Sequence, residues 1–271
     1  PDEGVSGTES TDLATVSLQD RGTTEFRTWT ASDDVSLSDL EDVTEAVGSG
    51  ELTRSSEIAN GDVVVHELQS TGLEGALGAE QTEDVTDQFY DVRDENVFDL
   101  TVEQSDAGAN QQPFGVKLNE SNTTVVADGA NDTYYVLFDT DGINTTRTDQ
   151  NIPDDEGLTA NFTVFNDNGF DFAPDDLDDD EDAETLVDYE VVKPELSVDE
   201  PYNVSNAADQ TVSGTTSLAP GTELTLRVRS TDGTSPSFLK TASPVVQSGG
   251  TWSVTLDFSE QNVGDTYEIV T

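Results

Sequence analysis

Residues 208–230 read ADQTVSGTTSLAPGTELTLRVRS and contain two runs, 211–215 (TVSGT) and 223–229, in which apolar and polar side chains alternate. In the second run, 223–229 (ELTLRVR), Leu and Val would face one side of a strand and the charged residues the other. Such alternation is typical of half-buried β-strands. Between the runs, 218–221 (LAPG) supplies a turn, since proline fixes φ and glycine accepts a positive φ. The stretch therefore predicts the opening of a small antiparallel sandwich.

The charge balance predicts a salt-adapted protein. The 271 residues carry 58 Asp and Glu against 10 Lys and Arg, a formal charge of −48. Self-repulsion would destabilise a compact state at low salt, whereas in molar salt the Debye length is only about 3 Å. An acidic disordered tail is the alternative, but 33% apolar residues and regular strand patterns argue against it. Nucleic acid is excluded as a partner, because this surface repels phosphates.

Other compositional features narrow the class of protein. The chain has no cysteine, which excludes disulfides and thiolate metal sites. No run of roughly 18 apolar residues is present, so we expect no membrane span in this segment. The chain starts at Pro1, and 267–271 (YEIVT) reads as a strand without a closing turn, so we expect an internal piece of a longer polypeptide. An open edge there could be completed by a strand of the next segment or of a neighbouring subunit.

Pattern and composition predict three parts. Residues 1–30 read as a linker and the tail of a preceding β domain, 31–193 as a β-rich domain with short helices, and 194–271 as a β-sandwich domain. Ser36 and Asp39 approximate a capping box that would begin a helix over 36–47. Further short helices are expected at 72–79 and 82–90. Candidate strands are 25–30, 62–68, 97–103, 114–119, 123–127, 133–139, 158–165 and 186–192.

Several stretches resemble the cell-surface glycoproteins of haloarchaea, the S-layer type and its relatives. Residues 212–230 (VSGTTSLAPGTELTLRVRS), with 238–240 (FLK) and 250–253 (GTWS), resemble the Ig-like repeat of that family. Residues 12–31 (DLATVSLQDRGTTEFRTWTA) resemble the end of a preceding domain, and 57–79 (EIANGDVVVHELQSTGLEGALGA) is also similar. The resemblance implies a mainly β fold of tandem Ig-like sandwich domains, the first with one or two short helices. It also implies an extracellular place at the cell surface.

N-linked glycosylation is the strongest chemical signal. Asn-x-Ser/Thr sequons are acceptors for N-linked glycans in exported proteins. Five of the six lie between 119 and 161, mostly at predicted strand ends or turns. The sequon asparagines are Asn119, Asn122, Asn131, Asn144, Asn161 and Asn203.

An acidic run at 171–184 is a candidate calcium site, because nine of its fourteen residues are acids and Ca²⁺ prefers oxygen ligands. The spacing does not fit an EF-hand loop, and a solvated acidic loop is the alternative interpretation. The candidate ligands in this run are Asp171, Asp175, Asp176, Asp178 and Asp180.

Nothing in the sequence indicates catalysis. His66, the single histidine, follows three valines on a predicted strand, where a structural role at an edge or strand end is expected. No phosphate-binding loop, dinucleotide fingerprint or His-Glu-x-x-His motif occurs. We therefore expect no enzymatic activity and no cofactor other than glycans and, at 171–184, calcium.

The expected function is structural: a surface glycoprotein that assembles with copies of itself into an S-layer or a surface filament. The alternatives are a monomeric adhesin or ligand-binding ectodomain, and an exported hydrolase whose catalytic domain lies outside this stretch. Assembly in high salt with divalent ions would separate the first function from the others.

Overall fold

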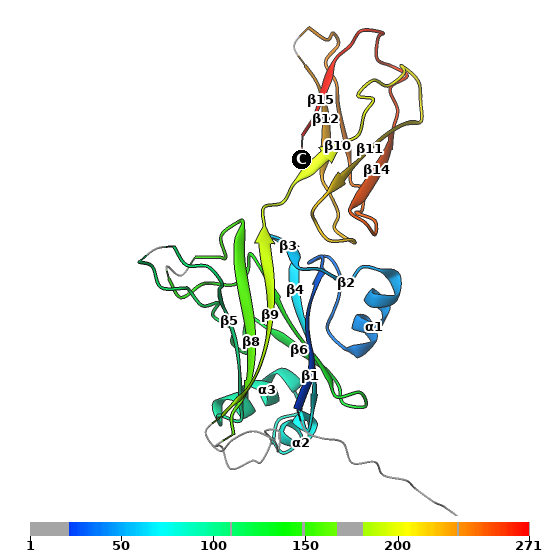
Figure 1. Ribbon diagram of the computed structural model, residues 1–271. Coiled ribbons are helices and arrows are strands. Elements are labelled where there is room, and N and C mark those ends of the chain that lie inside the picture. The colour runs from blue at the N-terminus through cyan, green and yellow to red at the C-terminus, as the bar shows by residue number, and fades with distance from the viewer. Residues whose placement is uncertain (1–21, 109, 148–149, 167–180, 232, 271) are drawn as a thin grey trace, which may run out of the picture.

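The computed structural model describes residues 22–108, 110–147, 150–166, 181–231 and 233–270. Within these ranges the chain is mainly β, as predicted, and its strands form four sheets. Two β units lie end to end, joined by the short segment between β9 (Ala183–Val192) and β10 (Leu196–Val198) (Figure 1). The predicted boundary at residue 193 falls in this segment.

The first sheet has five antiparallel strands in the order β2-β1-β4-β7-β6. They are β1 (Gly22–Ala31), β2 (Thr53–Arg54), β4 (Val63–Thr71), β6 (Thr124–Asp128) and β7 (Thr133–Asp139). Residues 22–30, assigned from sequence to the tail of a preceding domain, pair along β4 instead. The reason is packing: Phe26 of β1 belongs to the main core of the first unit.

The second sheet has the strand order β3-β9-β8-β5. Its strands, besides β9, are β3 (Glu57–Ala59), β5 (Phe98–Gln104) and β8 (Glu156–Val164). β3 pairs with β9 in parallel, and the other pairs are antiparallel. Alternate residues of β5 and β8, such as Leu100 and Phe162, are buried against the first sheet. The period-two pattern that predicted these strands therefore marks their core-facing sides.

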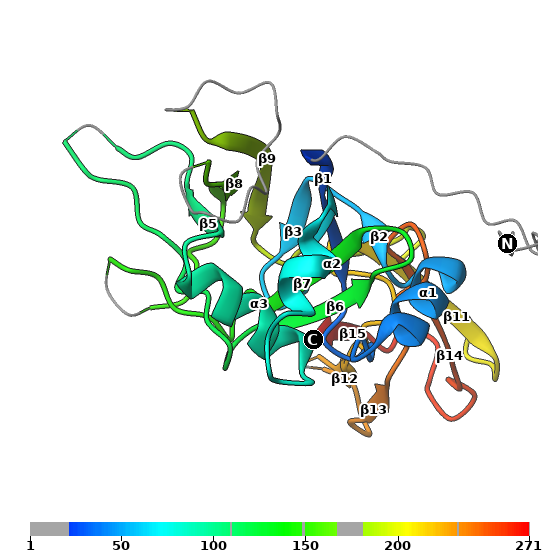
Figure 2. The same cartoon turned by 90° about the horizontal axis from the view of Figure 1, so that it is seen from below.

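Two short helices cover the end of the first unit that lies away from the second unit (Figures 1 and 2). They are α2 (Leu73–Leu77) and α3 (Val85–Asp94). Both were predicted, α3 with a later start and end. Asp84 caps α3 by accepting from the backbone N–H groups of Thr86 and Asp87. Leu73 and Phe89 bury their side chains in the main core.

The third helix, α1 (Leu40–Ser49), packs on the opposite face of the first sheet. Val43 of α1 joins Val63 and Val65 of β4 in a second core, while Val64 faces the main core. The valine run of β4 is continuous because its strand is covered on both faces. The helix begins later than predicted, because Asp39 rather than Ser36 caps it: the Asp39 carboxylate accepts from the Asp42 N–H at 3.0 Å.

The predicted strand at 114–119 does not form. Its backbone makes only isolated bridges, Glu103↔Gly115 and Val116↔Thr145, to two different segments. Pro113 and Gly115 flank its first residue, and both disfavour a regular ladder. Phe114 and Val116 nevertheless contribute to the main core.

The second unit consists of two antiparallel three-stranded sheets, β10-β11-β14 and β13-β12-β15. Besides β10, the strands are β11 (Gln210–Thr216), β12 (Leu226–Ser230), β13 (Leu239–Ala242), β14 (Thr251–Leu256) and β15 (Tyr267–Val270). Trp252 is 1% exposed and centres a core that includes Leu226 and Val228. The two runs of the opening stretch thus lie in facing sheets of a sandwich.

Candidate functional site: sequons, the unit junction and a C-terminal pocket

Four of the sequon asparagines are exposed in the folded chain: Asn119, Asn131, Asn144 and Asn203. All four lie outside the named strands, in connections between them. Asn131 lies in the turn between β6 and β7, where its side-chain amide donates to the Asp128 carboxylate at 2.7 Å. A glycan could be attached at any of these positions without displacing a buried side chain.

Asn122 is half-buried and its side chain is engaged at both ends. Its amide nitrogen donates to the carbonyl of Lys117 at 2.7 Å, and its oxygen accepts from the N–H of Asn119 at 2.9 Å. A glycan would replace one of the two hydrogens on this nitrogen and leave a single N–H to donate. The side chain of Asn122 therefore shapes the loop that presents Asn119.

Asn161 departs from the expectation that sequons lie at strand ends. It stands in the middle of β8 and pairs with Thr101 on one side and Leu186 on the other. Its side-chain oxygen is buried and has no hydrogen-bond partner among the described residues. In the folded protein this asparagine is half-buried, as Asn122 is, in contrast to the four exposed sequon asparagines.

The predicted calcium ligands Asp171, Asp175, Asp176, Asp178 and Asp180 lie outside the described residues. Among the residues that are described, no group of three or more His, Cys, Asp or Glu side chains is placed to hold a metal ion.

His66 lies inside the first unit, not at an edge. It sits on β4 between β1 and β7 and is 0% exposed. The rings of Phe26, Phe138 and Tyr189 surround it at centroid distances of 5.4, 5.8 and 5.3 Å. Burial lowers the pKa of His66 to about 3, so the imidazole is neutral. A residue closed to solvent in an aromatic cage has no access to a substrate, which supports its expected structural role.

Two carboxylates of the first unit bind backbone amides of the second, an arrangement that the sequence did not indicate. Asp62, 2% exposed, accepts from the N–H of Ala219 at 2.8 Å, and Asp34 accepts from the N–H of Glu223 at 2.9 Å. Burial, with a smaller contribution from the charge of Asp33, raises the pKa of Asp62 to about 7. The predicted turn at 218–221 is therefore also the contact that joins the units.

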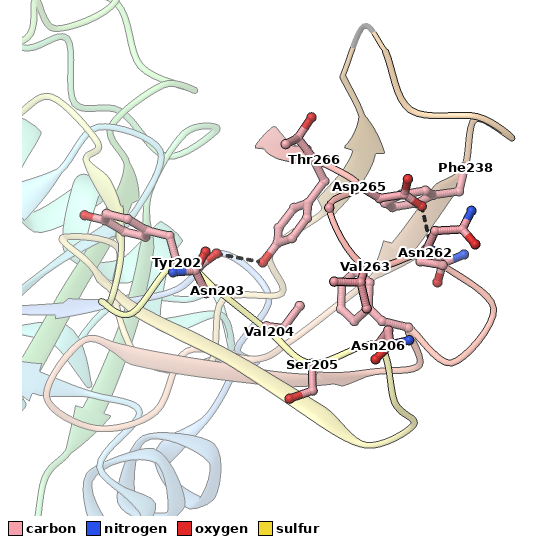
Figure 3. Close-up of a pocket in the computed structure, with 14 residues that line it drawn as sticks. Tyr202, Asn203, Val204, Ser205, Asn206, Phe238, Asn262, Val263, Asp265 and Thr266 are labelled. Atoms are coloured by element: carbon pink, nitrogen blue, oxygen red, sulfur yellow. Dashed lines mark hydrogen bonds between the residues drawn. The ribbon is translucent and has the colours of Figure 1, made fainter.

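A cavity of about 330 Å³ opens in the second unit between two loops (Figure 3). Residues 202–206, between β10 and β11, form one wall, and residues 261–267, leading into β15, form the other. The hydroxyl of Tyr267 donates to the carbonyl of Tyr202 at 3.3 Å across one end of the cavity, and the Tyr202 ring points away from it (Figure 3). Sequence reasoning missed this site, because the two walls are about sixty residues apart and only the fold brings them together.

The lining of the cavity is aromatic and amide-rich. The rings of Phe258 and Tyr267 lie 5.4 Å apart between their centroids, and Phe238 stacks edge-on against Phe258 at 6.2 Å. Of the fourteen lining residues, Asp265 alone carries a charge, and its carboxylate accepts from the N–H of Asn262 at 2.7 Å. The side-chain oxygen of Gln261 is buried and finds no partner in the described part of the chain.

Comparison with known proteins gives three relatives that align along almost the whole chain. A "Cell surface glycoprotein" of Haloferax gibbonsii is 42% identical over 98% of this chain. "Cell surface glycoprotein 2" and "Cell surface glycoprotein 1" of Haloarcula hispanica are 32% and 30% identical, each over 96% of it. The chain is a homologue of the haloarchaeal cell surface glycoproteins.

The homology confirms the resemblance inferred from residues 12–31, 57–79 and 212–230. This chain spans about 30% of the length of each of these relatives. No protein-family model matches it. Within the described ranges, none of the helices has the length and apolarity needed to cross a membrane.

Proposed function

We propose that this chain is a structural segment of an extracellular surface glycoprotein that assembles with copies of itself into a layer or filament, and that it has no catalytic role. Homology supports the surface location and the haloarchaeal origin. The acidic composition suits a protein exposed to brine. The buried hydrogen bond from the N–H of Ala219 to the Asp62 carboxylate joins the two units directly, which suits a structural segment.

The free edge of β15 is the observation that carries the assembly proposal. Among the described strands, β15 pairs with β12 alone, so its other edge presents unpaired backbone groups. A groove of about 350 Å³ runs beside this edge. Apolar side chains, among them Val198, Val204, Val212 and Ile269, line it. An added strand would pair with β15 and cover this apolar surface, as in β-augmentation.

The second unit supports the Ig-like assignment, which remains part of the proposal. Two antiparallel sheets face each other over one core, and the chain crosses between them from β11 to β12, from β13 to β14 and from β14 to β15, as expected of an Ig-type sandwich. The large buried tryptophan lies on β14, in the sheet of β10 and β11.

Glycosylation and calcium binding belong to the same proposal. The exposed sequons at Asn119, Asn131, Asn144 and Asn203 are the expected acceptors. Calcium binding by the acidic run remains a prediction from sequence. Isothermal calorimetry in molar KCl tests it, and the absence of binding at millimolar Ca²⁺ would contradict it.

Electron microscopy of the purified protein in molar salt, with and without Ca²⁺, tests assembly. We expect a regular array or fibre from the parent chain. Val270→Lys places a charge beside the free edge and should abolish assembly, because lysines on edge strands oppose pairing. Val47→Lys is the matched control, since Val47 is 43% exposed on α1, against 38% for Val270, and lies away from that edge.

Each outcome separates the possibilities. Assembly by Val270→Lys equal to that of the parent would reject the β15 edge as the contact. Dispersed particles from the parent chain under all conditions would reject self-assembly and favour a monomeric ligand-binding ectodomain. The cavity beside Tyr267 is the feature that such an ectodomain would use.

A further inference from the structure

The cavity between residues 202–206 and 261–267 contains a complete sequon in its wall. Asn203, Val204 and Ser205 all line it, and Asn203 is exposed at its rim (Figure 3). The asparagine that would carry the glycan is therefore one of the residues that line the cavity. A glycan extending from Asn203 would begin at the mouth of a preformed depression.

The charge of the lining excludes ionic ligands. The chain as a whole carries 58 acids and 10 bases, yet one acid is the single charged residue among the fourteen that line the cavity. That acid, Asp265, is already bonded to the backbone of Asn262. A cation would meet a single carboxylate that is already hydrogen-bonded. An anion would meet a strongly negative protein and no cation among the lining residues, although Lys240 lies over the rings of Phe238 and Phe258, which line the cavity. The ligand that fits is neutral.

The remaining groups match a sugar ring. Phe238 and Tyr267, both half-buried, offer aromatic surface for the C–H face of a sugar, and the exposed Asn206 and Asn262 offer amides that both donate and accept hydrogen bonds. A volume of about 330 Å³ lies at the lower end of the range for small-ligand pockets, ~300–1,000 Å³.

Gln261 adds an independent observation. Its side-chain oxygen is buried, and no described group donates to it. Buried acceptors in native proteins are normally satisfied. This oxygen is closed to solvent in the folded chain, so a sugar hydroxyl would become its donor once the Gln261 side chain turns toward the cavity.

We propose that the cavity holds the first sugars of a glycan attached to Asn203, so that this glycan packs against the second unit instead of extending freely into solvent. The inference rests on the proposed glycosylation of the chain. The tether favours the chain's own glycan over one from a neighbour, because attachment at the rim gives a high effective concentration. A glycan held in this way would tie the loop at 202–206 to the loop at 261–267.

Glycopeptide mass spectrometry and hydrogen exchange together test the inference. The chain is prepared from a glycosylating haloarchaeal host as the parent, as Asn203→Gln and as Asn131→Gln, and from bacteria without glycans. We expect Asn203 to be occupied and the amides of 262–266 to exchange about fivefold more slowly in the parent than in Asn203→Gln. Asn131→Gln, which removes another exposed sequon, should match the parent.

Gln261→Leu made in the same host provides a second test. Replacing an unpartnered buried acceptor by an apolar side chain should leave folding intact. We expect Asn203 to stay occupied in this variant while the slow exchange at 262–266 is largely lost. Retention of the full protection would overturn the assignment of Gln261 as the sugar's partner.

The other outcomes are equally decisive. Equal exchange at 262–266 in all preparations would overturn the inference. Slow exchange retained by Asn203→Gln but absent from the bacterial protein would also overturn it, because the sugar would then come from another chain. An unmodified Asn203 would overturn it too, while glycans found at Asn119, Asn131 or Asn144 would leave the proposed glycosylation intact.

Discussion

His66 is kept neutral by its aromatic surroundings, without any charged partner among the described residues. Phe26, Phe138 and Tyr189 exclude water, and Nδ1 lies 3.5 Å from the hydroxyl of Thr28. With a folded-state pKa of about 3, below the ordinary 6.5, the unfolded chain takes up the proton first as the pH falls. The stability contributed by neutral His66 is complete above pH 6.5 and is lost between pH 6.5 and pH 3.

His66→Phe should therefore make the free energy of unfolding less sensitive to acid. We expect the slope of the free energy of unfolding against pH, between pH 6.5 and pH 4, to decrease by up to about 1.4 kcal/mol per pH unit. Urea unfolding in molar KCl measures the slope, and repacking costs that are independent of pH do not affect it. Tyr189→Phe keeps the cage and should retain the parent slope. An unchanged slope in His66→Phe would contradict the buried neutral imidazole.

At the scale of the element, strand β11 depends on a residue without a side chain. A Cβ added at Gly214 would lie 1.9 Å from the carbonyl oxygen of Ser197 on β10 and 2.6 Å from the Trp252 ring on β14. The glycine in the opening stretch thus allows the backbones of β10 and β11 to pair directly beneath the tryptophan. In α1, by contrast, a Cβ at Gly48 would meet nothing within 4 Å.

These two glycines give opposite predictions. Gly214→Ala should destabilise the second unit by about 1–3 kcal/mol or more, because the added methyl group would clash with the Ser197 carbonyl oxygen and the buried Trp252 ring, and neither can move without disturbing its own packing. Gly48→Ala should stabilise α1 by roughly 0.5–1 kcal/mol through helix propensity. Thermal and urea unfolding of both variants in molar KCl measures the difference. A neutral Gly214→Ala would mean that β10 does not pair with β11 as described.

The elements that could be predicted from sequence are those with a regular period. Strands at 97–103, 133–139 and 211–215 were found within a residue or so, because alternation reflects burial on one face. The segment at 114–119 also contains apolar residues at alternate positions but forms no ladder, since its two bridges go to two different segments and Pro113 and Gly115 flank its first residue. The observed start of α1 also differs from the predicted one, because Ser36 and Asp39 could both serve as the N-cap.

The candidate sites were less predictable, because they depend on contacts between residues that are far apart in the sequence. A sequon is defined by three consecutive residues, so all six were visible in the sequence. The exposure of its asparagine depends on the fold, and Asn161 lies on β8, which is paired with β5 on one side and β9 on the other. The bond from Ala219 to Asp62 joins residues 157 positions apart. No sequence pattern specifies such pairs, which depend on how the two units meet.

At the scale of the whole molecule, the charge of −48 governs stability. We expect the melting temperature to fall steeply when KCl is lowered from about 2 M to about 0.1 M, as the Debye length rises to about 10 Å. Circular dichroism follows the transition. Glu184→Gln with Glu190→Gln removes two exposed charges of β9 and should make the salt dependence shallower. A melting temperature independent of KCl would contradict the salt adaptation.

The junction between the units has a consequence for divergence among related proteins. Asp62 and Asp34 bind the main-chain amides of residues 219 and 223, and no side chain of the second unit takes part in these two bonds. Substitutions that alter the outward-facing side chains of that turn would leave the bonds in place as long as the backbone keeps its course. The relative orientation of the two sandwiches can therefore be inherited unchanged while the outer surface of the second one diverges between species.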